Sequence, residues 1–231
     1  NLMQIQPGGN VGIGTSAPGT KLDVDGAITA GTANSTSGSV LMYGKYSNGH
    51  IATIGTEYAN GGLVLGYGVT PSTTAAGGFV SSSAATNLTR GAYSFAAGTH
   101  KWWSDPVNAT IAVGTTSPLN NTMTLLDTGN LGIGTTAPGA KLEINDTNKA
   151  INTKGNLFVS TTDALAIDKG GQISLGGVWS GTSQIQFAGI AGRKENATSG
   201  NAGGYLQLST TNSAGGNLTE RMRITSAGNV G

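Results

Sequence analysis

A motif of sixteen residues occurs twice in this chain, and a third copy begins at the last residues of the sequence. GNVGIGTSAPGTKLDV occupies residues 9–24, GNLGIGTTAPGAKLEI occupies residues 129–144, and GNVG occupies residues 228–231. Internal repetition of this kind is typical of architectures assembled from similar structural units. We therefore expect a modular fold and interpret the sequence as a segment of a longer modular polypeptide.

The repetition extends upstream of the motif, and it sets the boundaries of the expected modules. The pattern Met-x-Ile/Leu precedes the motif at residues 3–5, 123–125 and 222–224. We expect a first repeat element at residues 1–24, a β module at 25–121 with an aromatic-bearing insertion at 71–113, a second repeat element at 122–144, a second β module at 145–220, and the start of a third repeat element at 221–231.

Each repeat element predicts three short strands joined by tight turns. Met3 and Ile5 alternate with other residues at the period of a half-buried strand. Gly9 with Asn10 supplies the positive φ of a turn. Pro18-Gly19 suits the central positions of a type II turn. An element of this size is too small to be stable alone.

The middle strand of the element predicts one apolar side and one bare side. Val11 and Ile13 point one way, whereas Gly12 and Gly14 leave the other side without side chains. A strand that is bare on one side allows another backbone to approach closely. The apolar side then needs a partner surface, because a thin β layer has to bury its apolar face.

The composition favours thin β structure without a thick private core. The chain has 39 glycines among 231 residues, 10% charged residues and 6% aromatic residues, and much of its 37% hydrophobic fraction is alanine. No stretch keeps the apolar spacing of a helix over three turns. Residues 50–68 and 184–211 each predict two alternating strands around an Asn/Gly turn. We expect an all-β fold with little or no helix that completes its core between chains.

Two passages resemble a known family. LTERMRITSAGNVG at residues 218–231, together with the second motif copy, resembles the repeated boundary motif of bacteriophage tail fibres and related receptor-binding proteins. GIAGRKENATSGNAGGYLQLSTT at residues 189–211 is similar to passages of the same fibres. The family's self-cleaving chaperone domain of the endosialidase type would follow residue 231, so the resemblance assigns no self-processing to these residues. No enzymatic activity is expected here.

The resemblance implies an elongated homotrimeric fibre, either β-prism-like or intertwined. It implies a place in the tail fibre of the virion after assembly in the host cytoplasm. The implied partners are other copies of the chain, other tail-fibre segments and a glycan or protein receptor on the host surface. The residues expected to point into the trimer core are Val11, Ile13, Leu22, Val24, Leu131, Ile133, Leu142 and Ile144.

Charge and residue types argue against several other classes. With 12 basic and 11 acidic residues, the net charge of +1 offers no footprint for nucleic acid. No apolar run approaches the ~20 residues that span a bilayer, and no cysteine is present for thiolate sites. GIGTSA and GIGTTA fit the loose Gly-x-Gly-x-x-Ala pattern, but a Pro-Gly turn follows where a nucleotide-binding fold needs a helix. We expect no cofactor and no metal.

The insertion contains the strongest candidates for contact with a sugar. Tryptophan can stack on a sugar ring beside a polar neighbour. The alternative is that these aromatic residues fill the subunit interface, where such side chains are enriched. His50 and His100 are the only histidines, and we expect both on surface loops or module edges. The candidate glycan contacts are Tyr93, Trp102, Trp103 and Asp105.

Two other functions remain open at this stage. One is a tailspike that degrades host polysaccharide with paired acids on a β scaffold. The other is a bacterial surface adhesin or fibril built on the same trimeric principle. The first would release reducing sugars from capsule, and the second would be found on cells and not on virions.

Overall fold

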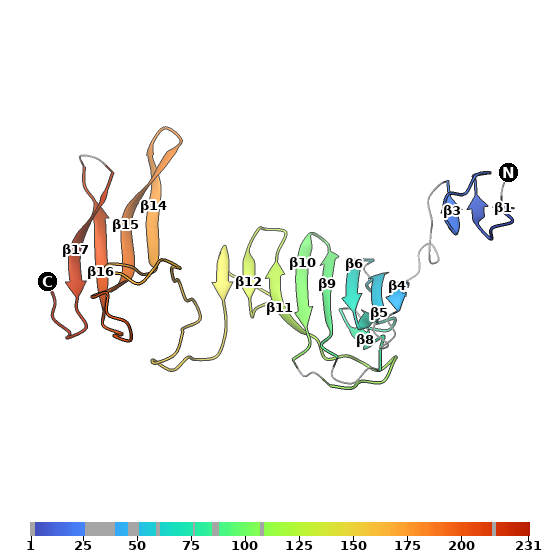
Figure 1. Ribbon diagram of the computed structural model, residues 1–231, viewed down its shortest axis with the longest axis horizontal. Helices are drawn as coiled ribbons and strands as arrows, with labels where there is room; N and C mark the ends of the chain where they lie inside the picture. Colours follow the sequence, from blue (N-terminus) through green and yellow to red (C-terminus); the bar gives the residue numbers. More distant parts are fainter. Residues whose placement is uncertain are drawn as a thin grey trace. The chain divides into compact units, whose positions relative to one another are not determined.

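The computed structural model describes residues 3–25, 40–45, 51–58, 61–75, 77–84, 88–106, 109–213 and 216–231. Within these ranges the chain forms strands and no helix (Figure 1), so the expected all-β class is confirmed. The chain is divided into two compact units, residues 1–147 (unit 1) and residues 148–231 (unit 2). His50 lies outside the described residues.

The two complete repeat elements fold in the same way. In each element the first two strands pair antiparallel, and the third strand pairs parallel to the second. The registers are equivalent: Met3 faces Ile13 in the first element, and Met123 faces Ile133 in the second. The parallel pairing was not predicted from the sequence. The strands are β1 (Met3–Ile5), β2 (Val11–Ile13) and β3 (Leu22–Val24), repeated as β11 (Asn120–Leu125), β12 (Leu131–Ile133) and β13 (Leu142–Ile144).

Polar side chains of the first motif copy hold its turns. The amide of Asn10 donates to the Pro18 carbonyl at 3.2 Å, and Lys21 Nζ donates to the Gly8 carbonyl at 2.7 Å. The Asp23 carboxylate accepts the Gly19 N–H at 2.9 Å. Each of these side chains satisfies a backbone group that has no ladder partner, as side chains do in irregular segments.

The second copy repeats all three bonds. Asn130 donates to Pro138 at 3.1 Å, Lys141 donates to Thr128 at 2.7 Å, and Glu143 accepts the Gly139 N–H at 2.8 Å. The predicted type II turn is wrong in both copies, because Gly19 and Gly139 do not have the positive φ that the third residue of this turn requires. The acidic side chain near the end of the motif holds this turn instead.

The predicted turn at Gly9 is confirmed, and it recurs in all three copies. Gly9, Gly129 and Gly228 have φ of 75°, 77° and 81°. In the third copy the Thr225 N–H donates to the Asn229 carbonyl at 3.0 Å, and an antiparallel bridge joins Ile224 to Val230. The equivalent bonds close the same turn in the first two copies.

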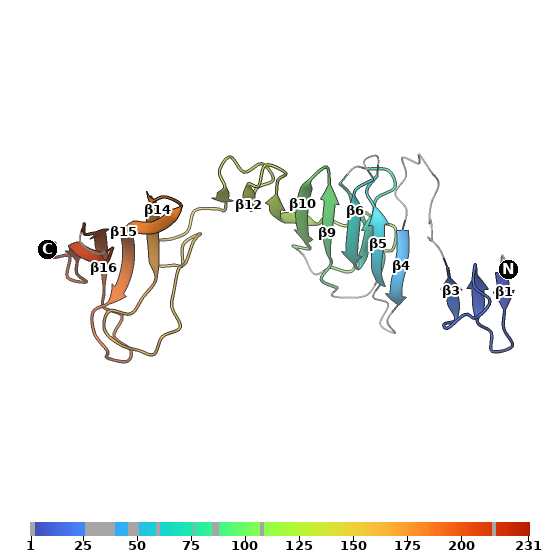
Figure 2. The ribbon, with the colours of Figure 1, turned by 90° about the horizontal axis from the view of Figure 1, so that it is seen from above.

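Unit 1 also contains a sheet that has eight strands among its described residues. Its order is β13-β12-β11-β10-β9-β6-β5-β4, and several of these strands lie side by side in Figure 2. The strands not yet named are β4 (Val40–Lys45), β5 (Ile51–Thr56), β6 (Leu63–Tyr67), β9 (Gly91–Ala96) and β10 (Thr99–Ser104). The predicted insertion at 71–113 therefore supplies two central strands, β9 and β10, which join β6 to the second repeat element.

A second layer covers one face of this sheet. The strands β7 (Val69–Pro71) and β8 (Phe79–Ser81) form a pair, and β7 contacts β5 and β6. Val64, Val69 and Phe79 are almost completely buried in the core between the layers. Trp103 packs against this core, with its ring 5.2 Å from that of Phe79, and donates to Ser94 Oγ at 3.0 Å.

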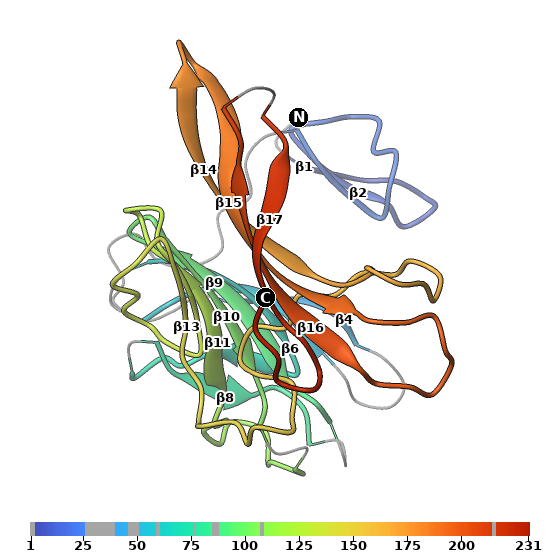
Figure 3. The ribbon, with the colours of Figure 1, turned by 90° about the vertical axis from the view of Figure 1, so that its left-hand side faces the viewer.

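Unit 2 is built on one antiparallel sheet of four strands in the part of the chain that is described. These are β14 (Gln172–Ser180), β15 (Ser183–Lys194), β16 (Gly204–Thr211) and β17 (Leu218–Ile224), paired in chain order. Figure 3 shows β14 and β15 as a long, twisted hairpin. The hairpin predicted at residues 184–211 corresponds to β15 and β16.

Candidate functional site: an uncovered apolar sheet face

The face of the eight-stranded sheet that points away from β7 and β8 is lined by apolar side chains. Direct cross-strand partners place these side chains on one side of the sheet. None of the described strand residues that point to this side is Asp, Glu, Lys or Arg. Its larger side chains are Ile54, Leu63, Leu65, Tyr67, Tyr93, Phe95, His100, Trp102, Met123, Leu125, Leu131, Ile133, Leu142 and Ile144, and the small residues Ala52, Thr56 and Ser104 point to the same side.

Many of these apolar side chains are open to solvent in the single chain. Leu63 is 42% exposed, Leu65 43%, Phe95 38% and Ile133 41%. Single exposed apolar residues are common on protein surfaces, but an extended uncharged patch marks an interaction site. We name this surface the apolar face of unit 1.

Four aromatic side chains form a cluster at the centre of this face. His100 lies 4.5 Å from the ring of Phe95, and Tyr93 lies 5.4 Å from the ring of Trp102. The hydroxyl of Tyr93 and Nδ1 of His100 are 2.5 Å apart and share a hydrogen bond. His100 was expected on a loop or module edge, and this prediction is wrong because β10 is an inner strand of the sheet.

The four candidate glycan contacts are divided between the two sides of the sheet. Tyr93 and Trp102 lie on the apolar face. Trp103 packs against the core on the covered side, since neighbouring residues of a strand point to opposite sides. The side chain of Asp105 is 0% exposed and pairs with Arg90, so it is not presented to a ligand.

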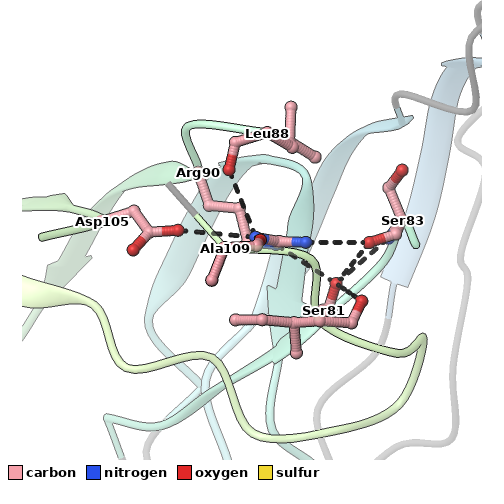
Figure 4. Close-up of polar contacts among 7 residues, drawn as sticks. Ser81, Ser83, Leu88, Arg90, Asp105 and Ala109 are labelled. Atoms are coloured by element: carbon pink, nitrogen blue, oxygen red, sulfur yellow. Dashed lines mark hydrogen bonds and ion pairs between the residues drawn. The ribbon is translucent and has the colours of Figure 1, made fainter. Parts of the chain in front are cut away.

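Arg90 is the centre of a buried polar network beneath the covered side (Figure 4). Its guanidinium lies 3.5 Å from the Asp105 carboxylate and donates to the Ala109 carbonyl at 2.7 Å. It also donates to the carbonyl of Ser83 at 3.1 Å and to Ser81 Oγ at 3.2 Å. A buried guanidinium with its donors engaged holds loops together and offers nothing to a substrate.

The first repeat element carries the same kind of apolar face as its second copy. Val11 pairs with Leu22 and Ile13 pairs with Val24, so the four side chains predicted for the trimer core point to one side. Ile13 is 43% exposed and Leu22 is 56% exposed, close to the 41% and 53% of their second-copy equivalents. The bare side behaves as expected, because the backbone of Thr15 comes close to Gly12.

Unit 2 has an apolar face of its own. Ile173, Ile190, Leu208 and Met222 are successive direct partners across the four strands. Leu175 lies beside Ile173 on the same side of β14 and is 52% exposed. With Leu206 and Ile224 these residues form the apolar face of unit 2.

The other side of the unit 2 sheet is polar and internally bonded. Arg223 lies over the ring of Tyr205 and bonds Glu220 at 2.8 Å, which holds the pKa of Glu220 below its usual value. Tyr205 donates to Asp168 at 2.6 Å. Burial, together with this bond, raises the pKa of Tyr205 to about 12. The polar side thus bonds within the chain, whereas the apolar face presents exposed side chains.

The apolar positions of the repeat motif were predicted from the sequence. The continuation of the apolar face of unit 1 across β10, β9 and β6 was not. The signal was available in the alternation of Leu63 with Leu65 and of Tyr93 with Phe95. The described residues contain no cluster of His, Asp or Glu suited to a metal ion, and no helix long and apolar enough to cross a bilayer.

No protein-family model matches the chain. A search of curated proteins also finds no match.

Proposed function

We propose that this chain is a trimeric, non-catalytic segment of a bacteriophage tail fibre that serves structure and host recognition in the virion. The observation that carries the proposal is an exposed apolar sheet face, which occurs in both units and in both complete repeat elements. The resemblance of residues 189–211 and 218–231 to tail-fibre sequences supports the tail-fibre assignment.

The energetics favour further copies of the chain as the partner of these faces. Burying one large apolar side chain is worth about 1.5–3 kcal/mol, and ordering a glycine-rich chain costs conformational entropy that the small private core has to offset. Further copies of the chain carry the same faces and can therefore supply the partner surface that each face needs. Closure around a threefold axis also protects strand edges from further pairing.

The same argument assigns Tyr93 and Trp102 to the subunit interface, because both lie on the apolar face. The other proposed partners are neighbouring tail-fibre segments and a host receptor, which would contact the outward-facing surfaces. Incubating the purified protein with host capsule tests the non-catalytic part of the proposal. We expect binding without release of reducing sugars, and sugar release would contradict it.

The mass in solution tests the proposal most directly. We expect light scattering of the purified chain to give three times the mass of 23.0 kDa. A monomer that melts cooperatively would overturn the proposal, since it would show that the apolar faces need no partner. Immunogold labelling of virions, and not of bacterial cells, is the expected result for the location.

A further inference from the structure

A hollow of about 590 Å³ lies in unit 2, near the turn that joins β14 to β15. Sites for small molecules commonly have volumes of about 300–1,000 Å³ and combine an apolar lining with a few polar groups. The hairpin of β14 and β15 supplies the apolar part of this lining, and the connection between β16 and β17 supplies the polar part. We name this hollow the hairpin pocket. Its lining includes Trp179, Ile185, Phe187, Asn212, Ser213 and Gly216.

Two β-bulges bring the aromatic side chains of the hairpin to this pocket. The register between β14 and β15 shifts twice, and the residues left without a cross-strand partner are Phe187 of β15 and Trp179 of β14. A bulge bends its strand and re-aims a side chain, and bulges are over-represented next to active sites. The two aromatic residues of the hairpin, which Figure 3 shows as long and twisted, are thus the two that leave the regular ladder, and both line the pocket.

Both aromatic rings are open to a ligand. Trp179 is 64% exposed and Phe187 is 46% exposed. Among the described residues, no other aromatic ring and no cation lies against either ring. An added Cβ at Gly177 would lie 3.0 Å from the Phe187 ring, so the absence of a side chain there leaves room for this ring. An open indole face can stack on the C–H face of a sugar ring.

The polar part of the lining has hydrogen-bonding groups that the described part of the chain does not use. The Asn212 N–H donates to the Asn217 carbonyl at 3.3 Å, but the Asn212 amide side chain and the Ser213 hydroxyl bond no other described residue. An amide side chain offers two donors and an acceptor, and a hydroxyl can do both. These groups match neighbouring sugar hydroxyls, which also donate and accept.

Contacts within the chain hold the two parts of the pocket together. The Thr211 hydroxyl donates to the Gln186 carbonyl, which ties the end of β16 to the hairpin. An added Cβ at Gly216 would lie 2.7 Å from Cδ1 of Ile185, so the connection also lies against the hairpin at this point. The pocket therefore exists in the single chain and does not need a ligand to form.

The surroundings of the pocket are polar but carry no charge. Residues 170–192 and 203–219 include no Asp, Glu, Lys, Arg or His, whereas Ser, Thr, Asn and Gln are frequent. An ionic ligand would lose hydration here without meeting an opposite charge. The sequence around the pocket consequently favours a ligand that is polar and neutral.

We propose that the hairpin pocket binds a neutral sugar unit of a host surface glycan. Trp179 stacks on the sugar ring, with Ile185 and Phe187 beside it. Asn212 and Ser213 bond the sugar hydroxyls. A purely apolar surface of a second copy would instead leave the Asn212 amide and the Ser213 hydroxyl buried without partners, which costs free energy. This inference rests on the host-recognition part of the proposed function and gives it a site and a ligand class.

Titration with simple sugars tests the site. The probes are the methyl glycosides of glucose, galactose, mannose and N-acetylglucosamine, with glucuronic acid as the anionic comparison, and saturation-transfer NMR detects binding. We expect at least one neutral glycoside to bind, with the strongest transfer at the protons of its C–H face, and glucuronic acid to bind less.

Substitutions assign the binding to the pocket. We expect Trp179→Ala and Asn212→Ala each to weaken binding about tenfold or more, and Trp179→Phe to keep part of it because a ring remains. Folding should tolerate the loss of the Trp179 ring, since most of it is exposed. Val178→Ala is the matched control: Val178 is 56% exposed on the same strand but does not line the pocket, so binding should not change.

Light scattering on the same samples separates this inference from the proposed trimer. A wild-type trimer that binds none of the four neutral glycosides, or a Trp179→Ala variant that binds them as tightly as wild type, would overturn the sugar site and leave the trimer standing. A smaller mass of Trp179→Ala would place Trp179 in the subunit interface and also overturn the site. A monomeric wild-type chain would contradict the proposed trimer, whether or not it binds sugar.

Discussion

At the scale of single residues, the structure places its strongest polar interactions where they hold loops. Arg90 is 1% exposed and bonds three carbonyls, a serine hydroxyl and the Asp105 carboxylate. A buried ion pair contributes little net stability compared with apolar packing, but removing one partner leaves the other charge buried and unpaired. The network is therefore vulnerable to single substitutions.

Replacing Arg90 tests this vulnerability. We expect Arg90→Ala to lower the free energy of unfolding by about 3–5 kcal/mol, because the Asp105 carboxylate stays buried without its cation. Denaturant titration at fixed protein concentration measures the change. Lys169→Ala is the control: the half-exposed pair of Lys169 with Asp163 should contribute only about 0–1 kcal/mol. Equal effects of the two substitutions would contradict the assigned role of Arg90.

Because the pKa of Tyr205 is raised, we expect this side chain to cause a loss of folding stability at alkaline pH. Its pKa of about 12 in the folded chain lies above the ordinary value of 10.0. The folded state thus favours the protonated phenol, and this contribution is complete below pH 10.0 and disappears as the pH rises towards about 12. We expect Tyr205→Phe to reduce the drop in melting temperature over that interval. An unchanged drop would show that Tyr205 does not titrate with the shifted pKa.

At the scale of secondary-structure elements, the sequence predicted what depends on near neighbours. The positive φ at Gly9, the alternation of Met3 with Ile5 and the hairpin of β15 with β16 all follow from local patterns. The parallel pairing of β2 with β3 could not be predicted in this way, because their connection at residues 14–21 is held by side-chain bonds to Pro18, Gly8 and Gly19.

Long-range pairing explains the remaining differences. The segment at 71–113 looked like an insertion because it has no counterpart in the second module. It supplies β9 and β10, whose partners β6 and β11 lie on either side of them in the sheet, and no local pattern specifies such partners. The burial of Asp105 likewise depends on Arg90, fifteen positions away in sequence.

Gly→Ala substitution should lower folding stability by different amounts at two glycines of the second repeat element. Gly129 has φ 77°, and an added Cβ would make only an ordinary contact with Lys141 Nζ at 3.5 Å, so Gly129→Ala should cost about 1–2 kcal/mol for the left-handed backbone. Gly134 has φ 74°, and an added Cβ would also overlap the Asn145 carbonyl oxygen. Gly134→Ala should cost clearly more and separate β12 from β13.

Hydrogen exchange detects this separation. The Asn145 N–H donates to the Ile133 carbonyl at 2.9 Å, and its protection should fall in Gly134→Ala and persist in Gly129→Ala. Equal protection of this amide in both variants would show that the connection can shift to accommodate the methyl group.

At the scale of the whole molecule, each unit has one sheet side that packs or bonds within the chain and one side with exposed apolar side chains among its described residues. In unit 1 the covered side holds the core and the Arg90 network, and in unit 2 the polar side holds the Tyr205–Arg223–Glu220 interactions. The described strand residues on the apolar face of unit 1 include no charged side chain, so the association that this face supports should depend weakly on salt, unlike association driven by exposed charges.

A charge placed on the apolar face of unit 1 should prevent association. We expect Phe95→Asp to convert the trimer to smaller species at micromolar concentration, because three carboxylates would be buried near one another. Val113→Asp is the control, since Val113 is 63% exposed but does not belong to that face. The wild-type melting temperature should also rise with protein concentration. If Phe95→Asp still assembled fully, the apolar face of unit 1 would not be part of the subunit interface.

The self-contained bonding of the repeat motif has an evolutionary consequence. Each complete copy closes its turns with its own Asn, Lys and acidic side chains, and the two copies keep the same strand registers although different segments precede and follow them. Homologous recombination between copies would join foreign segments at a junction that already folds correctly. The intervening segments are then free to be swapped, lengthened or lost between genomes while the junctions keep their geometry.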